Sequence, residues 1–176
     1  MRKRIMLAAA IAVLTPIWAA ATVADSAANG FTVKITLNLK AAPAEVYKKI
    51  LRVGDWWNAE HTYSGDAHNL TIEEKPGGCW CEKLPNGGGV KHMEVLTLMP
   101  GSRIVMSGGL GPLQNIAAAG TMIFQIAKDG DGSKLTLTYS VAGYLPAGMN
   151  TWAAPVDTVL TEALTRFKDY AEPSSR

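Results

Sequence analysis

The chain has 176 residues, of which 48% are hydrophobic and 18% are charged, with 17 basic and 15 acidic side chains. This length suits one domain with a substantial hydrophobic core. The basic residues form no cluster of the kind that a nucleic-acid surface needs, and two cysteines are too few for a disulfide-dense scaffold.

Residues 1–24 have the three parts of a secretory signal peptide. The basic start MRKR precedes the apolar stretch IMLAAAIAVL, and Pro16 and several small residues follow. We therefore expect cleavage after Ala21 or Ala24 and a location in the periplasm or outside the cell. The apolar stretch is short for a membrane span and no later stretch reaches that length, so no transmembrane segment is expected after signal removal.

Removal of this leader changes the charge balance. It takes Arg2, Lys3 and Arg4 from the 17 basic residues, which leaves 14 against 15 acidic ones and a net charge of −1. The sequence pI of about 8.5 is therefore a property of the leader, and the mature chain is not expected to bind nucleic acid.

The next segments predict a strand, a short helix and a series of hairpins. Residues 31–40 (FTVKITLNLK) alternate apolar and polar side chains, which predicts a strand with one buried face. Residues 41–51 predict a helix, because Pro43 suits its first turn and Glu45 complements its N-terminus. Residues 55–69 predict an irregular or briefly helical segment. Six further strands are predicted between turn-forming residues: LTIEE, GCWCEKL, VKHMEVLTL, RIVMSG, TMIFQIAK and SKLTLTYSV.

The last predicted element is a long amphipathic helix over residues 151–172. Apolar side chains recur at offsets of three and four and form one stripe that must pack on the sheet. The sequence therefore predicts an α+β fold, in which a curved antiparallel sheet of about seven strands wraps around this helix and short helices follow the first strand. We expect a single domain over residues 30–171 and a flexible tail over 172–176. The stripe consists of Val156, Val159, Leu160, Ala163, Leu164, Phe167 and Tyr170.

The alternation in the last strand also predicts its inner face. Leu135, Leu137, Tyr139 and Val141 alternate with Thr and Ser residues, so we expect them to face the helix, with the Tyr139 hydroxyl available to a ligand. In the preceding strand both faces are partly apolar, and the direction of its Met-Phe-Ile set stays open.

A curved sheet that grips one C-terminal helix resembles the START/pollen-allergen-like superfamily, also called SRPBCC, which includes polyketide cyclases and lipid carriers. The resemblance rests on NLKAAPAEVYKKI, WWNAEHTYSG, GGCWCE, GPLQ and APVDTVLTEAL, and the later motifs resemble a bacterial exported subgroup without a defined activity. It implies a cavity between sheet and helix that holds apolar small molecules. It implies no single reaction, because the fold hosts carriers and enzymes alike.

The hairpin GGCWCEKLPNGGGVKHME raises the question of a metal site. A tight Asn-Gly turn would pair Cys79 with Glu94 and Cys81 with His92, which puts these four side chains on one face. Thiolates and imidazole suit zinc or copper, but Cys-x-Cys on a flat strand does not suit a tetrahedral ion, so we predict no metal and keep Cys79, Cys81 and His92 as weak candidates. A disulfide would need a bulge, and we favour two free thiols that line the cavity.

The segment WWNAEHTYSG is the stronger candidate for a ligand site. Trp56, Trp57, His61 and Tyr63 combine aromatic faces with polar tips and are expected at the cavity mouth, although both tryptophans could equally fill the core. His61 is a candidate general acid or base, as is His92. No catalytic residue is firm, because no orienting carboxylate can be placed beside His61 from the sequence.

The glycine-rich segment SGGLGPLQNIAAAG is not a phosphate loop, because a strand follows it and it lacks the basic residue of that motif. We expect a loop over one end of the cavity, with Leu110, Leu113 and Ile116 as apolar contacts. The sequence also lacks the G-x-S-x-G motif of serine hydrolases, and no cofactor is predicted.

The sequence thus predicts an exported protein that holds an apolar or amphipathic ligand, either lipid-like or aromatic. The alternatives are a cyclase-like or hydratase-like enzyme that uses a pocket histidine, and a non-catalytic protein-interaction module of the cell envelope; we favour a binder that is not an enzyme. Ligand identity, oligomeric state and cavity volume stay open. The expected ligand-binding residues are Trp56, Trp57, His61, Tyr63, Cys79, Cys81, His92, Leu113, Tyr139, Val156, Leu160 and Leu164.

Overall fold

The computed structural model describes residues 22–172, so most of the predicted signal peptide and the end of the predicted tail lie outside the described residues. The described chain forms one antiparallel sheet with the strand order β1-β2-β8-β7-β6-β5-β4-β3, two α-helices and several short 3-10 helices. The strands are β1 (Thr22–Ala27), β2 (Gly30–Leu39), β3 (Leu70–Ile72), β4 (Cys79–Lys83), β5 (Gly89–Met99), β6 (Arg103–Ser107), β7 (Ala117–Asp129) and β8 (Gly132–Tyr144). The helices are α1 (Pro43–Leu51) and α2 (Ala153–Ala171).

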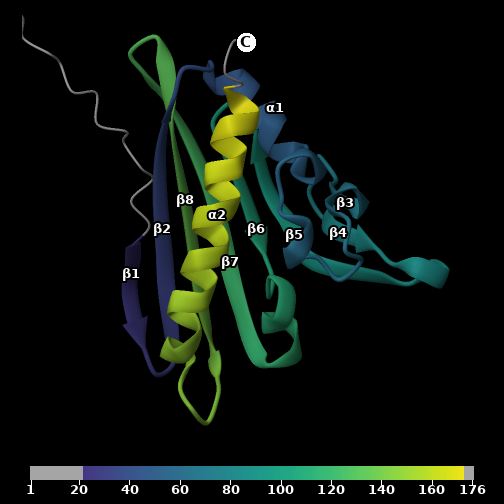
Figure 1. The fold of residues 1–176 in the computed structure, drawn as a ribbon. Coiled ribbons are helices and arrows are strands. Elements are labelled where there is room, and N and C mark those ends of the chain that lie inside the picture. The colour runs from purple at the N-terminus through teal and green to yellow at the C-terminus, as the bar shows by residue number, and fades with distance from the viewer. Residues whose placement is uncertain (1–21, 173–176) are drawn as a thin grey trace, which may run out of the picture.

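The predicted fold class is confirmed, with one strand that the sequence did not predict. All seven predicted strands are present, and α2 lies along the concave side of the sheet (Figure 1). The additional strand is β1, which pairs antiparallel with β2 and places Val23 opposite Val33. Its sequence TVADSA is small and polar and shows little alternation, so only pairing with β2 defines it as a strand.

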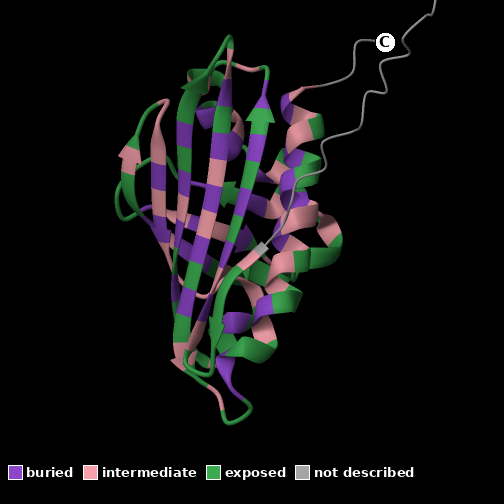
Figure 2. Ribbon diagram, turned by 90° about the vertical axis from the view of Figure 1, so that its left-hand side faces the viewer, coloured by how far each residue is buried: buried purple, intermediate pink, exposed green. Residues whose placement is uncertain are grey.

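Alternate side chains along the long strands are buried on the face that meets the helix (Figure 2). The predicted inner set of β8 is buried, from Leu135 to Val141. The register also settles the open question in β7, because Met122 pairs with Tyr139 and Phe124 with Leu137. Side chains of directly paired residues lie on the same face of a sheet. The Met-Phe-Ile set of β7 therefore belongs to the inner face.

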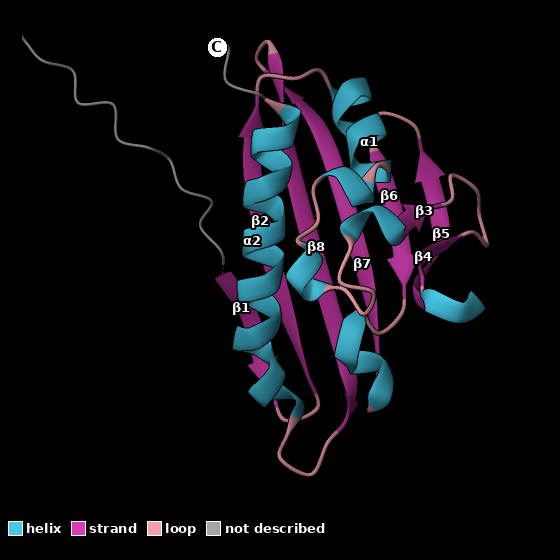
Figure 3. Cartoon of the chain, turned by 45° about the vertical axis from the view of Figure 1, so that its right-hand side comes forward, coloured by secondary structure: helices cyan, strands magenta, loops and turns pink. Residues whose placement is uncertain are grey.

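Helix α2 buries its predicted stripe against the sheet. Leu160, Leu164 and Phe167 are buried, whereas Thr165 and Asp169 on the other side are exposed. Helix α1 and the short 3-10 helices at 53–61 lie beside α2 over the same face of the sheet (Figure 3). None of the described helices is both long and apolar enough to cross a membrane.

The register of the β4–β5 hairpin differs from the prediction. Cys79 pairs with Glu94 and Trp80 with Met93 as expected, but Cys81 then pairs with Lys91 because a bulge interrupts the ladder at His92. A bulge leaves one extra residue on one strand, and it re-aims the side chains beside it. The prediction that His92 shares the face of the cysteines is therefore wrong.

The cysteines are also not free thiols. Cys79 and Cys81 form a disulfide with Cα atoms 5.3 Å apart, a separation that an extended strand does not reach without the bend in this hairpin. Both residues are half-buried on the outer face, while Trp80 and Glu82 between and after them are buried on the inner face.

Candidate functional site

A cavity of about 260 Å³ lies between α2, the segment that contains Trp57 and Tyr63, the β4–β5 hairpin and the 3-10 helix Gly111–Asn115. Its walls are mainly aromatic and aliphatic. The sequence analysis predicts a cavity between the sheet and α2, and the observed cavity meets α2 in its N-terminal half, from Pro155 to Leu160. The lining residues are Trp57, Glu60, His61, Thr62, Tyr63, Leu70, Trp80, His92, Leu110, Gly111, Pro112, Leu113, Trp152, Pro155, Val156, Val159 and Leu160.

The two adjacent tryptophans have different roles. Trp57 lines the cavity and meets Trp80 edge to face, with ring centroids 5.1 Å apart. Trp56 is buried against Phe167 of α2 with its centroid 5.3 Å away, and it does not line the cavity. The indole N–H groups bond to backbone carbonyls, that of Trp56 to Lys49 and that of Trp57 to His61. The segment therefore contributes one cavity wall and one core side chain.

The structure brings seven of the twelve expected residues to the cavity and leaves five elsewhere. Leu164, like Trp56, is part of the hydrophobic core. Cys79 and Cys81 lie on the outer face as a disulfide, which excludes them from the wall. The fifth is Tyr139, described next. The seven that line the cavity are Trp57, His61, Tyr63, His92, Leu113, Val156 and Leu160.

Tyr139 supports the loop over the cavity and does not line the cavity itself. Its hydroxyl donates to the carbonyl oxygen of Gly108 at 2.9 Å and accepts from the backbone N–H of Leu110 at 3.0 Å. The ring packs closely over Gly120, where a Cβ atom would lie 2.6 Å from the Tyr139 ring. The expectation that this hydroxyl is available to a ligand is therefore corrected, because the loop uses both its donor and its acceptor.

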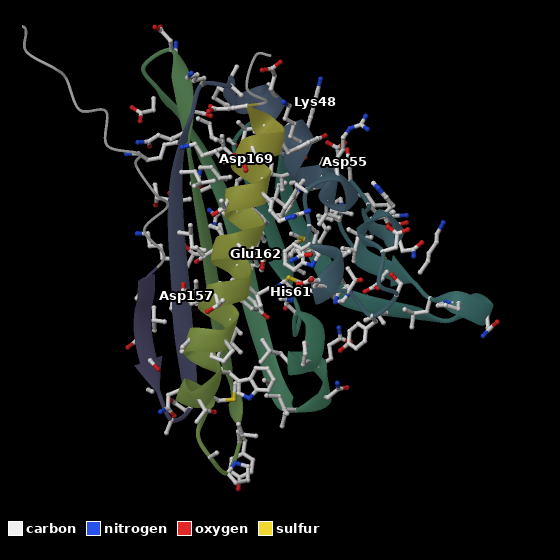
Figure 4. The ribbon with its side chains drawn as sticks, in the orientation of Figure 1. Lys48, Asp55, His61, Asp157, Glu162 and Asp169 are labelled. Carbon is white, nitrogen blue, oxygen red and sulfur yellow. A yellow bond between two sulfur atoms is a disulfide. The ribbon has the colours of Figure 1, made fainter. Side chains whose placement is uncertain are left out.

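His61 has the orienting carboxylate that the sequence could not place. Its Nε2 atom lies 3.0 Å from Oε2 of Glu162 on α2, and the other oxygen of that carboxylate accepts a hydrogen bond from the side-chain amide of Asn58 (Figure 4). His61 and Glu162 are both partly exposed. The pair joins the segment after α1 to α2 at the edge of the cavity, which His61 lines.

A second histidine–glutamate pair is buried in the wall. His92 Nε2 lies 3.0 Å from Oε2 of Glu82, and both side chains are almost inaccessible. Glu82 also accepts a hydrogen bond from the backbone N–H of Ser64. Burial opposes the charge of Glu82, but the hydrogen bonds from Ser64, Tyr63 and His92 outweigh it and lower the pKa of the carboxyl. Burial lowers the pKa of His92, against the opposing effect of Glu82.

The weak metal candidates are not grouped. Cys79 and Cys81 are joined to each other on the outer face, and the bulge places His92 on the inner face. Across residues 22–172 no group of three or more His, Cys, Asp or Glu side chains is placed to hold a metal ion.

Sequence reasoning did not select several lining residues. Trp80 lies between the two cysteines, so it faces inward only if the cysteines face outward, which is the opposite of the face that the sequence analysis favours. Trp152 and Pro155 precede the regular stripe of α2, and no periodic signal includes them. Val159 lies in the predicted stripe and Leu110 in the predicted loop, so both could have been chosen from the sequence.

The chain has a helix-grip-like fold, and the structures that it matches are SRPBCC-like proteins. No protein-family model matches the sequence, and no curated protein matches it. The similarity is to solved structures. One is CalU16 from Micromonospora echinospora, with a TM-score of 0.58 at 15% identity over 88% of this chain and 85% of that chain.

Two further structures show the same fold. The conserved protein of unknown function EF2215 from Enterococcus faecalis matches with a TM-score of 0.61 at 14% identity, over 89% of this chain and 80% of that chain. The di-domain ARO/CYC BexL from the BE-7585A biosynthetic pathway matches with a TM-score of 0.56 at 18% identity, over 85% of this chain and 52% of that chain. Identities this low establish the fold and leave the function to the site.

Proposed function

We propose that this protein binds a compact apolar small molecule in the cavity between α2 and the hairpin β4–β5. The observation that carries the proposal is the cavity itself, whose walls combine Trp57, Trp80 and Tyr63 with aliphatic side chains of α2. Apolar and aromatic walls with a few polar groups are typical of small-molecule sites. Proteins with the SRPBCC fold typically bind hydrophobic ligands, which supports the same function.

The volume of the cavity limits the size of the ligand. About 260 Å³ is slightly below the range of roughly 300–1,000 Å³ that is typical for drug-sized ligands. One ring or two fused rings match this space better than a long acyl chain does. Of the lipid-like and aromatic ligands that the sequence predicts, we therefore favour the aromatic class.

Export is part of the proposal. The leader-like residues 1–24 support it, and so does the Cys79–Cys81 disulfide, because disulfides persist mainly in oxidising compartments. Cleavage after Ala21 would keep β1 whole, whereas cleavage after Ala24 would remove Val23 and its pairing with Val33. We therefore favour the first site. Mass spectrometry of the exported protein tests this, and a mature chain that begins at Asp25 would contradict it.

Ligand binding is tested with a neutral fluorescent probe and two variants of α2. Val159 lines the cavity, so Val159→Trp should fill it and weaken binding of N-phenylnaphthylamine at least tenfold. Thr165 is exposed on the same helix, so Thr165→Trp adds the same side chain outside the cavity and should bind like the wild type. Native mass spectrometry of mild extracts should show a small ligand on the wild type. Absence of binding to the wild type, or equal binding by both variants, contradicts the proposal.

A second candidate function is proton transfer on the bound ligand, as in a cyclase or hydratase. The specific observation in its favour is the contact between His61 and Glu162, since a carboxylate that orients an imidazole is typical of general acid–base sites. With a compact enone as substrate, His61→Gln should abolish turnover, whereas probe binding should weaken by no more than a few-fold, because glutamine can still donate to Glu162. Unchanged turnover would exclude His61 from catalysis and leave the binding function intact.

A further inference from the structure

The residues that line the cavity differ in how much of their surface a ligand can reach. Trp80 and His92 are 1% and 4% exposed, so they offer a ligand almost no polar surface. Tyr63, in contrast, is 48% exposed, and Trp152 is partly exposed. The aromatic surface that a ligand can reach therefore belongs mainly to Tyr63 and Trp152.

The charged groups that a ligand can reach are mainly acidic. Glu60 is exposed, it lines the cavity, and its carboxylate takes part in no ion pair among the described residues. Glu162 and His61 are both partly exposed and face each other at the edge of the cavity (Figure 4). Two carboxylates thus lie near one imidazole, and the lining residues within the described range include no Lys or Arg.

The basic residue nearest to this group along α2 is anchored elsewhere. Arg166 lies one helical turn beyond Glu162, and its Nε–H donates to the backbone carbonyl of Trp56 at 3.2 Å. Trp56 belongs to the core, and neither it nor Arg166 lines the cavity. The carboxylate of Glu60 is therefore left without a basic partner at the cavity edge.

This arrangement favours a positively charged ligand group. Attraction between charges acts over several ångströms, so a carboxylate at the cavity edge stabilises a nearby cation without direct contact. It repels a carboxylate or phosphate in the same way. Cations are also attracted to the faces of aromatic rings, and Tyr63 and Trp152 provide accessible aromatic surface in the same cavity.

We propose that the cavity selects an organic cation, in which a compact apolar body carries an ammonium group. The body lies against the aliphatic side chains of α2, and the ammonium group lies at the cavity edge, in the field of Glu60. This inference rests on the proposed binding function and specifies the charge of its ligand. Fatty acids, phosphates and other anions of similar size are rejected.

The test measures the affinities of three matched compounds for the full-length protein by displacement of N-phenylnaphthylamine and by calorimetry. They are naphthylmethylamine, which is protonated at neutral pH, the neutral naphthylmethanol and the anion naphthoate. Naphthylmethylamine should bind about threefold or more tightly than naphthylmethanol, and naphthoate should be the weakest, because one unit charge at several ångströms changes affinity several-fold. The advantage of the cation should shrink as the ionic strength rises from about 0.02 to 0.5 M, since salt screens exposed charges.

Two variants assign the charge effect to a residue. Glu60→Gln keeps the shape of the side chain without its charge and should reduce the ratio of the amine affinity to the alcohol affinity about threefold. Asp131→Asn removes one negative charge in the turn between β7 and β8, where Asp131 is exposed and does not line the cavity, and should keep the ratio of the wild type. Both substitutions are at exposed positions, and the compound series itself uses the wild type.

The outcomes separate the two proposals. If naphthylmethanol or naphthoate binds as tightly as the amine, the selection of a cation is wrong and the binding function stands. If Glu60→Gln and Asp131→Asn give the same ratio, the role of Glu60 is wrong. If neither the probe nor any of the three compounds binds, the proposed function fails as well.

Discussion

The imidazole of His61 and the carboxylate of Glu162 meet at 3.0 Å and connect the segment after α1 to the middle of α2 (Figure 4). The two residues are 101 positions apart in the sequence. Because Glu162 also accepts from Asn58, one carboxylate fixes two points of the segment that forms the cavity edge. The same contact orients the only histidine that is both partly exposed and part of the cavity wall in the described chain.

We expect Glu162→Ala to speed ligand release more than it lowers stability. Partly exposed ion pairs contribute about 0–1 kcal/mol, so the free energy of unfolding should fall by no more than about 1 kcal/mol. The segment at Asn58 and His61 loses both side-chain bonds to α2, and the dissociation rate of N-phenylnaphthylamine should rise several-fold. Stopped-flow dilution measures this rate, and Asp169→Ala, exposed on the same helix, is the control. Equal dissociation rates in the two variants would show that the contacts of Glu162 do not slow ligand release.

Tyr139→Phe should loosen the loop over the cavity. Burial raises the pKa of Tyr139 to about 12, so the hydroxyl keeps its proton and remains a donor at neutral pH. Removing the hydroxyl leaves the Gly108 carbonyl and the Leu110 N–H without this partner, which should cost about 1–2 kcal/mol in the free energy of unfolding. Urea denaturation measures the cost, and hydrogen exchange at Leu110 should become faster. Unchanged exchange at Leu110 would contradict this role of Tyr139.

Stability should fall on mild acidification because of His92. Its pKa is lowered in the folded state, so below about pH 6.5 the unfolded chain binds more protons than the folded one does. The free energy of unfolding therefore decreases as the pH drops from about 6.5 toward 5, by at most ~1.4 kcal/mol per pH unit for one proton. The lowered pKa of Glu82 acts in the same direction, but the stability that its carboxylate contributes is lost at lower pH, where carboxylates titrate.

His92→Gln isolates this contribution. The glutamine amide can still donate to Glu82 but does not titrate. The free energy of unfolding of the variant should therefore change less steeply with pH between about 6.5 and 5 than that of the wild type. His61 and His68 are present in both proteins and cancel in the comparison. Parallel slopes in urea denaturation across this range would show that His92 titrates alike in both states.

Loss of the disulfide should leave ligand binding intact. Cys79→Ser/Cys81→Ser removes a bridge on the outer face, and neither cysteine lines the cavity. The affinity for N-phenylnaphthylamine should therefore stay within about twofold of that of the wild type, a change in binding free energy well below the roughly 1.4 kcal/mol that a tenfold loss represents. The bridge closes a very short loop, and its loss should cost only about 1–2 kcal/mol in the free energy of unfolding. Alkylation of the unreduced, denatured wild type should modify no cysteine. Two modified thiols in that protein would disprove the bridge.

The pattern of side chains along the chain was sufficient to predict most of the elements. In a strand, every second residue lies on the same face, and in a helix, residues three or four apart do. The alternation in β2 and β8 and the stripe on α2 can therefore be recognised within each segment, without knowledge of the rest of the fold. The stripe also required a partner surface, and the sheet was the only one available. Trp57 and Leu113, which are among the expected ligand-binding residues, both line the cavity, and each lies next to an element that the sequence predicts.

What the sequence could not determine depends on pairing between distant segments. The bulge at His92 follows from how β5 fits β4 as a whole, and one extra residue sends the following side chains to the opposite face. The same bend brings Cys79 and Cys81 into a disulfide and His92 against Glu82. The contact of His61 with Glu162 depends on how α2 lies across the sheet. The sequence alone thus determined the layers and the inner faces of β2, β8 and α2, since these follow from local periodicity. Only tertiary packing decided the inner faces of β4 and β7 and which polar groups meet at the cavity wall.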